Sequence, residues 1–363
     1  MTEGQGAGAD SPAVVVNLQD RRPIWAFPEW AAAELREVVR ELPALGELYI
    51  SSSVADGSGD GAGGPAPDVL EALRTARVYM GYGIPPVVLE AAGERLEWVH
   101  TGTAGVGGSL HPEMLRRLRE GRLRFTNSAG IHGPPIAETV VGMLLHFFRG
   151  LDFAVTAQSA GRWDTAPFLA ADTPVGEIGS STVGILGYGG IGREVARRLL
   201  PFGGRVLGLR RSPPPDGRKL EDGVELLHGP RGLETLLAES DALVVAAPET
   251  PDTRGILDAQ NLRALRPGAI LVNVARGSLV DEDSLVECLR DGHLRGAGLD
   301  VFHREPLPGD SPLYTLPNVL ITPHVSGVSR GFWRREMDLI AENLRRFAAG
   351  EPLRNAVDPG AGY

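Results

Sequence analysis

From residue 182 onward the chain alternates long apolar runs with amphipathic stretches, and no other feature restricts its fold as strongly. The apolar runs that fit buried strands are TVGILG, RVLGL, DALVVAAP, AILVNVA, AGLDVF and VLITPH. The stretches between them have the apolar spacing of helices, and Asp281 can cap the helix predicted in DEDSLVECLRDG. Strands that are apolar along their whole length are covered on both faces. This part of the chain therefore predicts a doubly wound parallel sheet.

The residues before about 125 predict a second, smaller parallel α/β unit, because short apolar runs again alternate with helical patterns. A helical pattern over 134–158 is apolar on most of its circumference, as in a core helix or a helix at a subunit interface. The stretch 330–350 predicts an amphipathic final helix. Residues 1–12 and the Gly-rich segment 51–67 lack apolar residues that could pack, and we expect both to be flexible.

The composition excludes several classes of protein. The 363 residues carry a formal net charge of −10, which argues against nucleic-acid and membrane-surface binding. The single cysteine, Cys288, excludes a disulfide framework and a Cys-rich metal site, and we expect no metal. No apolar run reaches the roughly 18 residues of a membrane span, and the acidic start does not resemble a secretory signal. We therefore expect a soluble, cytoplasmic protein.

The segment between the first long strand and its helix matches the pattern GxGxxG. It reads Gly187-Tyr188-Gly189-Gly190-Ile191-Gly192. A preceding strand and a following helix are the context in which this pattern binds dinucleotides. Gly187 permits a tight turn, Gly189 lets a pyrophosphate approach the backbone, and Gly192 lets the helix pack closely on the strand. The sheet is thus predicted to be a Rossmann fold with a dinucleotide at the helix start; the alternative is a glycine-rich turn without a ligand.

The end of the second strand bears on which dinucleotide is bound. In this fold a carboxylate at that point usually accepts a hydrogen bond from the adenosine ribose 2′-OH. Here Arg210, Arg211 and Ser212 stand in its place, and no acid occurs before Asp216. Because guanidinium groups pair well with phosphate, we expect NADP to be preferred, with NAD possible.

Several stretches together resemble the D-isomer-specific 2-hydroxyacid dehydrogenases. They are LEWVHTGTAGV, NSAGIHGPPIAETVVGMLL, TVGILGYGGIGREVARRLLPFG, VVAAPETPDTRGILD, GAILVNVARGSLVDEDSLVECL, GAGLDVFHREPLP and PNVLITPHVSG. The resemblance implies a flavodoxin-like substrate-binding domain built from 1–127 and 326–363, and an NAD(P)-binding domain over 128–325. It also implies hydride transfer between NAD(P)H and a small 2-keto acid, such as glyoxylate or hydroxypyruvate.

The family's catalytic arginine, acid and histidine fall on Arg276 in NVARG, Glu305 in DVFHREPL and His324 in TPH. Each lies at or just beyond the carboxyl end of a predicted strand, where open α/β sheets bind ligands. The guanidinium of Arg276 suits the oxygens of a 2-keto acid, which makes it a substrate-binding residue as well. A histidine can supply the proton that the carbonyl oxygen needs during reduction, and a carboxylate neighbour stabilises and orients its protonated ring.

The resemblance assigns further binding positions. For the cofactor these are Ala247 and Pro248 at the adenosine and Thr253 at a further contact a few residues on. Val274 and Ala275 lie along the nicotinamide, and Asp300 lies near its ring. For the substrate carboxylate they are the backbone amides of Gly105, Val106 and Gly107, an arrangement of the kind that binds anions.

Two other functions are compatible with the sequence. One is the oxidation of 3-phosphoglycerate on the same scaffold. The other is a nucleotide-sensing corepressor that keeps the dinucleotide site without turnover. For partners, we expect a small 2-keto or 2-hydroxy acid, no nucleic acid and no membrane. The apolar helical pattern from about 135 further predicts a homodimer.

Overall fold

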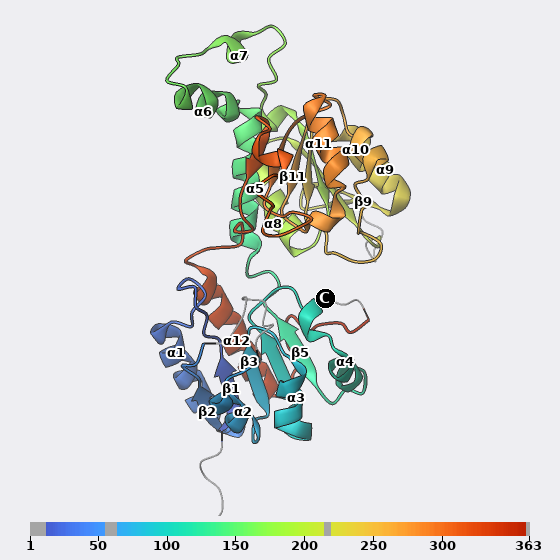
Figure 1. Ribbon diagram of the computed structural model, residues 1–363. Coiled ribbons are helices and arrows are strands. Elements are labelled where there is room, and N and C mark those ends of the chain that lie inside the picture. Colours follow the sequence, from blue (N-terminus) through green and yellow to red (C-terminus); the bar gives the residue numbers. More distant parts are fainter. Residues whose placement is uncertain (1–11, 55–63, 214–218, 361–363) are drawn as a thin grey trace, which may run out of the picture. The chain divides into compact units, whose positions relative to one another are not determined.

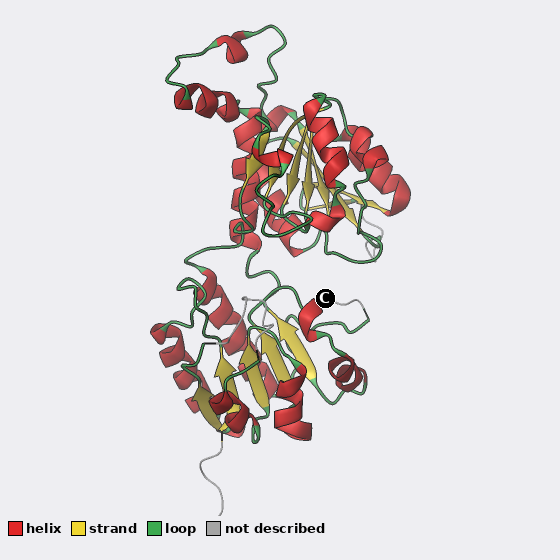
Figure 2. Cartoon of the chain, viewed as in Figure 1, coloured by secondary structure: helices red, strands yellow, loops and turns green. Residues whose placement is uncertain are grey.

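The computed structural model describes residues 12–54, 64–213 and 219–360. These residues form two compact units, shown in Figures 1 and 2. Unit 1 contains the described residues of Met1–His132 and Ser329–Tyr363, and unit 2 contains those of Gly133–Val328. The sequence placed its boundaries at 127/128 and 325/326. Segment 1–11 and the centre of the Gly-rich segment, 55–63, lie outside the described residues. The flexibility expected for these two segments therefore stays a prediction.

Unit 1 is built on a five-stranded parallel sheet. Its strands are β1 (Pro12–Asn17), β2 (Glu47–Ile50), β3 (Val78–Gly81), β4 (Trp98–Thr101) and β5 (Arg124–Asn127). They lie in the order β2-β1-β3-β4-β5, and every neighbouring pair is parallel. This is the strand order of flavodoxin, so the predicted class of the smaller unit is confirmed.

Helices cover both faces of this sheet. They are α1 (Glu29–Arg40), α2 (Pro67–Leu73), α3 (Pro86–Ala92), α4 (Pro112–Arg119) and α12 (Phe332–Ala348). Alternate side chains of β1 separate the two cores: Val14 and Val16 pack with α1 and α12, whereas Val15 packs with α2 and α3. The predicted amphipathic final helix is α12, and it returns the end of the chain to unit 1.

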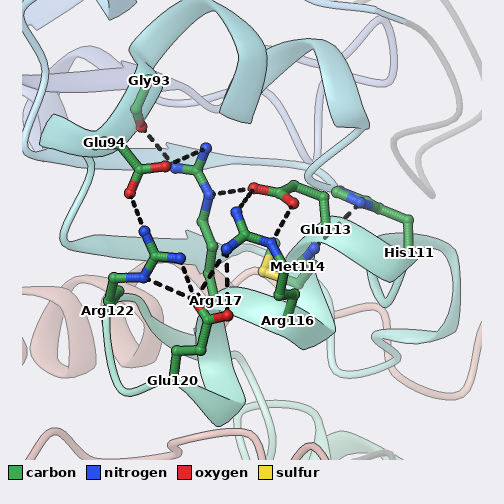
Figure 3. A network of polar contacts seen from close by, with 9 residues as sticks. All are labelled: Gly93, Glu94, His111, Glu113, Met114, Arg116, Arg117, Glu120 and Arg122. Carbon is green, nitrogen blue, oxygen red and sulfur yellow. Dashed lines mark hydrogen bonds and ion pairs between the residues drawn. The ribbon is translucent and has the colours of Figure 1, made fainter.

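The surface of α4 carries an extended network of ion pairs, which Figure 3 shows together with the His111 N-cap. His111 Nδ1 accepts the Met114 N–H at 3.3 Å. The charged members are Glu94, Glu113, Glu120, Arg116, Arg117 and Arg122. Hydrogen bonds from two of these arginines lower the pKa of Glu113 to about 2. The network contains three carboxylates and three guanidinium groups, so its formal charges cancel.

Unit 2 is built on an eight-stranded sheet. The strands are β6 (Thr182–Leu186), β7 (Arg205–Arg210), β8 (Leu220–Glu221), β9 (Val224–His228), β10 (Ala242–Val245), β11 (Ala269–Asn273), β12 (Leu294–Leu299) and β13 (Val319–Ile321). Their order is β13-β12-β11-β10-β6-β7-β9-β8, and only β8 is antiparallel to its neighbour. From β9 to β12 this is the doubly wound order of dinucleotide-binding folds, which confirms the predicted class.

The helices of unit 2 also cover two faces. They are α5 (Gly133–Phe148), α6 (Leu151–Ser159), α7 (Ala166–Leu169), α8 (Gly190–Leu199), α9 (Gly229–Glu239), α10 (Ala259–Arg263) and α11 (Glu282–Arg290). One core contains apolar residues of α5 and α8, and the other contains those of α9, α10 and α11. The Asp281 carboxylate accepts the Ser284 N–H at 2.9 Å, so the predicted cap of α11 is confirmed.

The expected long helix over 134–158 is wrong, because α5 and α6 are separate helices bent by 74° at their junction. Gly150 causes the break: its φ of +65° is left-handed, and a Cβ there would lie 2.9 Å from Phe168. No single described helix is long and apolar enough to cross a membrane; only this bent pair reaches the required length and composition when its two helices are joined.

Candidate active site

The predicted residues of unit 2 gather at one edge of its sheet. Because neighbouring strands are parallel, their carboxyl ends share this edge. Gly187 follows β6, Ala247 follows β10, Arg276 follows β11, Asp300 follows β12 and His324 follows β13. The predicted substrate loop, 105–107, belongs to unit 1 and is described separately below.

The glycine-rich turn has the geometry that a dinucleotide requires. Gly187 has a φ of +104°, and a Cβ there would lie 2.4 Å from the backbone N of Ala247. A Cβ on Gly192 would lie 2.4 Å from Gly187 O, so glycine is needed for α8 to pack this closely on β6. At Gly189 and Gly190, in contrast, a Cβ would meet nothing within 4 Å. The N-terminus of α8 is therefore open to a pyrophosphate, and the residues fit the group.

Tyr188 follows β6 in the chain and lies against the end of β7, where its N–H donates to Leu209 O at 2.7 Å. Charged residues surround it there. Arg210 ends this strand, half-buried, and the Arg193 guanidinium lies 5.0 Å from the centre of the Tyr188 ring. Burial raises the pKa of Tyr188, and the nearby charge of Glu221 adds to the increase. The sequence analysis missed Glu221 because the short β8–β9 hairpin that carries it was not predicted. Glu221 forms an ion pair with Arg193.

The other predicted residues at this end have the following positions. Arg211 and Ser212 are exposed after β7, and Ala247 is buried after β10. The Thr253 hydroxyl donates to Pro248 O at 2.6 Å and accepts the N–H of Thr250 at 2.8 Å, which closes the loop after β10. The side chain of Thr253, a position that the resemblance assigned to cofactor binding, thus holds the backbone of this loop.

Arg276 lies on a short turn after β11. Asn273 supports this turn by donating to Arg276 O at 3.0 Å and accepting the Ala275 N–H at 3.0 Å. Val274 and Ala275 are buried, whereas Arg276 is exposed, and its Nη1 donates to Ala275 O at 2.7 Å. A Cβ on the following residue, Gly277, would lie 1.9 Å from the carbonyl carbon of Phe302. Glycine there lets the turn contact the segment that leads to Glu305.

His324 and Glu305 form a direct pair. The Nδ1 atom of His324 lies 2.6 Å from Glu305 Oε2, and Glu305 Oε1 accepts the Phe302 N–H at 3.0 Å. Because a carboxylate only accepts, Nδ1 carries a proton, and Nε2 is left for a reacting group. The His324 side chain is 50% exposed, so a ligand can reach it. This pair can act as a general acid and base.

Asp300 holds the loop that carries His324. It is completely buried, and its carboxylate accepts the N–H groups of Val325 and Ser326 and the hydroxyls of Thr322 and Ser326. The His324 N–H donates to Asp300 O at 2.8 Å, and this helps maintain the left-handed φ of +53° at His324. The sequence analysis placed Asp300 near the nicotinamide but missed these loop contacts. The Thr and Ser flanking the histidine in ITPHVSG were the available signal.

The loop after β4 in unit 1 presents its backbone amides outward. Ser128 N–H donates to Thr103 O at 3.0 Å, Asn127 Nδ2 to Ala104 O at 2.9 Å, and Thr103 Oγ1 to Gly105 O at 2.8 Å. A trans peptide points its N–H opposite to its C=O. The N–H groups of Ala104, Gly105 and Val106 therefore point away from these donors. Such a run of amides suits a carboxylate.

A Rossmann sheet with an open helix start, a basic turn and a His–Glu pair at one edge has the groups that a nicotinamide-dependent oxidoreductase needs. Comparison with known proteins agrees. The family described as D-isomer specific 2-hydroxyacid dehydrogenase, NAD binding domain, matches residues 141–326. The glyoxylate/hydroxypyruvate reductase A of Escherichia fergusonii is 36% identical over 285 residues, which cover 77% of this chain and 85% of that protein.

Two further proteins place the chain in the same group. The D-3-phosphoglycerate dehydrogenase of Mycobacterium tuberculosis is 38% identical over 226 residues, 62% of this chain and 41% of that protein. A D-isomer specific 2-hydroxyacid dehydrogenase from Xanthobacter autotrophicus, solved with NADPH and MES, has a TM-score of 0.74 and 31% identity, covering 98% of this chain and all of that one.

The chain belongs to the D-isomer-specific 2-hydroxyacid dehydrogenase family. It is an oxidoreductase that transfers hydride between a nicotinamide nucleotide and a 2-keto or 2-hydroxy acid, and the resemblance found in the sequence is confirmed.

Proposed function

We propose that this enzyme reduces small 2-keto acids, such as glyoxylate or hydroxypyruvate, with NADPH as the preferred donor. The observation that carries the proposal is the pairing of His324 with Glu305 through Nδ1, which leaves Nε2 for a substrate oxygen. Arg276 is exposed on the turn after another strand of the same sheet, β11. The substrate type of the Escherichia fergusonii relative supports the choice of acid.

The side chains divide the reaction between them. When bound, the reduced nicotinamide supplies hydride to the C2 carbon of the keto acid. Protonated His324 gives its Nε2 proton to the C2 oxygen, so the carbonyl becomes a hydroxyl and the ring becomes neutral. Glu305 accepts a hydrogen bond from Nδ1 and so orients the ring for transfer. Arg276 donates to the carboxylate and carbonyl oxygens of the acid. In unit 1, the backbone amides of Gly105, Val106 and Gly107 are the groups that we propose to receive a carboxylate. In the reverse direction, neutral His324 takes the hydroxyl proton.

A panel of 2-keto acids, assayed with NADPH and with NADH, tests this proposal. We expect consumption of NADPH with glyoxylate or hydroxypyruvate. Oxidation of 3-phosphoglycerate without reduction of unphosphorylated keto acids would instead assign the phosphoglycerate activity. Binding of nucleotide without turnover of any acid would indicate a nucleotide-sensing protein.

Cofactor choice gives the first specific prediction. Arg210, at the end of β7, can donate to a 2′-phosphate. Glu221 lies on β8 and forms an ion pair with Arg193. One charge-assisted hydrogen bond is worth about 1.5–3 kcal/mol, so we expect at least about a tenfold preference for NADPH in kcat/KM. Arg210→Asp should abolish or reverse that preference.

The matched control is Arg290→Asp, because Arg290 is an exposed arginine at the C-terminal end of α11. It should leave the ratio of the two kcat/KM values unchanged. A wild-type enzyme that prefers NADH would show that Arg210 does not select the nucleotide.

We also propose a homodimer, with the segment from α6 to α7 as its interface. The apolar face of α5, on which the sequence-based expectation depended, is buried in the core of unit 2. The two most exposed large apolar side chains among the described residues lie further along, where the chain extends away from the sheet of that unit (Figure 1). Trp163 is 94% exposed and Leu169 is 78% exposed, and apolar side chains exposed to this degree favour a contact with another chain.

The double substitution Trp163→Ser with Leu169→Ser should convert the dimer to a monomer in light scattering at micromolar concentration. Tyr314→Ser, at another exposed aromatic residue of unit 2, is the control and should leave the mass unchanged. A double variant that keeps the wild-type mass would place the interface elsewhere, and a monomeric wild type would contradict the dimer itself.

A further inference from the structure

Unit 1 contains a buried polar network that the proposed chemistry does not use. His100 on β4, Thr126 on β5, Ser128 just after β5 and Glu336 on α12 are all completely buried. His100 Nε2 lies 2.8 Å from Glu336 Oε1, and its Nδ1 lies 2.9 Å from Thr126 Oγ1. The Ser128 hydroxyl shares its one proton between Glu336 Oε1, at 2.9 Å, and Thr101 O, at 3.0 Å.

Stability alone does not account for this network. A buried carboxylate and imidazole are desolvated, and apolar residues of similar volume often stabilise such a position as well or better. Glu336 Oε2 also has no hydrogen-bond partner among the described residues, although buried acceptors normally have one. Keeping these polar groups buried therefore lowers the free energy of unfolding relative to an apolar replacement, which points to a role in specifying the local geometry.

Ser128 connects the network to the loop after β4. Its N–H donates to Thr103 O and its hydroxyl to Thr101 O, so one residue bonds to two carbonyls at the start of this loop. A second chain of bonds continues from there: Thr101 Oγ1 accepts the Gly83 N–H at 3.1 Å and lies 3.0 Å from Thr103 Oγ1. The Thr103 hydroxyl donates its one proton to Gly105 O. In the contact between the two hydroxyls, Thr101 is therefore the donor and Thr103 the acceptor.

The direction of these bonds determines the direction of the amides. The carbonyls of Thr103, Ala104 and Gly105 accept these hydrogen bonds, so the N–H of the one residue after each of them points the opposite way. These are the N–H groups of Ala104, Gly105 and Val106. Ala104, Gly105 and Gly107 are exposed, and no hydrogen bond among the described residues uses the N–H groups of Gly105, Val106 or Gly107. These N–H groups thus have no partner among the described residues and can donate to a ligand.

We propose that Ser128, held by Glu336 and His100, is a positioning residue for substrate binding. It keeps the loop after β4 in the conformation whose amides receive the carboxylate of a 2-keto acid. Glu336 and His100 act through Ser128 and do not touch the substrate. This inference rests on the proposed function, because it takes the same loop as the carboxylate site.

The variant Ser128→Ala removes the hydroxyl and keeps the backbone bond to Thr103 O. We expect KM for glyoxylate or hydroxypyruvate to rise about three- to tenfold, the factor that corresponds to one hydrogen bond. The value of kcat and the Kd of NADPH, measured by fluorescence, should stay within about twofold. Glu336→Gln should raise KM in the same direction, and the double variant should show less than the product of the two effects because the residues act in one network.

Thr75→Ala is the matched control. The Thr75 hydroxyl also donates to a distant backbone carbonyl in unit 1, Pro12 O at 2.9 Å, but at the other end of the strands. Its loss should change the melting temperature without changing KM. An unchanged KM in Ser128→Ala, or an equal rise in Thr75→Ala, would overturn the positioning role while the enzyme still reduces keto acids. A wild type that reduces no 2-keto acid would overturn the proposed function, and this inference with it.

Discussion

Replacing His324 with alanine should lower kcat for keto-acid reduction by about 10²–10⁴-fold, the range that a general acid contributes. The ring is oriented before substrate arrives, because Glu305 bonds to Nδ1 and Asp300 bonds to the loop around it. Its loss removes a proton donor that the structure has already placed. Half of the side chain is exposed, so we expect the circular dichroism spectrum and the Kd of NADPH to remain close to those of the wild type.

His303→Ala provides the control for this experiment. His303 is an exposed histidine two residues before Glu305. Among the described residues its one hydrogen bond is from the backbone N–H to Glu282 Oε2, at 3.2 Å. Its substitution should change kcat by less than about twofold, because no proton transfer is assigned to it. A His324→Ala enzyme that retains more than half of the wild-type kcat would show that another group protonates the carbonyl oxygen.

The positions of the candidate residues at strand ends could be predicted from the sequence, because apolar runs mark strands and parallel strands end at one edge. Arg276 and His324 each follow such a run within a few residues. The contacts that support them could not be predicted in the same way. Asp300 and the loop around His324 are more than 20 residues apart in the chain, and no local pattern reveals that its carboxylate bonds to Val325 and Ser326.

The fold shows the same division between local and distant causes. The parallel α/β class of both units follows from alternating strands and helices, and it was predicted. The order of the strands within each sheet was not predicted from this alternation, which is the same in both units. The break at Gly150 was missed because the flanking residues continue an apolar helical pattern, and a glycine inside such a pattern is often tolerated. The short strand Leu220–Glu221 was missed because two residues carry no periodicity. Its pairing depends on β9, which follows it in a tight hairpin.

Substituting lysine for Arg276 should raise KM for the keto acid about tenfold or more, while the Kd of NADPH stays within about twofold. Lysine keeps the positive charge but loses the planar fork that donates to two oxygens at once. Loss of one charge-assisted hydrogen bond costs about 1.5–3 kcal/mol, and each 1.4 kcal/mol is a factor of ten. Arg276→Ala, which removes the charge as well, should raise KM further. Steady-state kinetics at saturating NADPH separates the two parameters.

The control is Arg304→Lys, because Arg304 is an exposed arginine in the segment that carries Glu305. Arg304 carries the same charge but has no assigned contact with the substrate. The KM of the Arg304→Lys enzyme for the keto acid should therefore be unchanged. If the general positive potential of the edge attracted the acid, both arginine-to-lysine variants would behave alike and neither would change KM. If Arg276→Lys instead weakened NADPH binding and left KM unchanged, Arg276 would bind the nucleotide. A rise in KM confined to Arg276→Lys therefore requires the bidentate geometry at that one position.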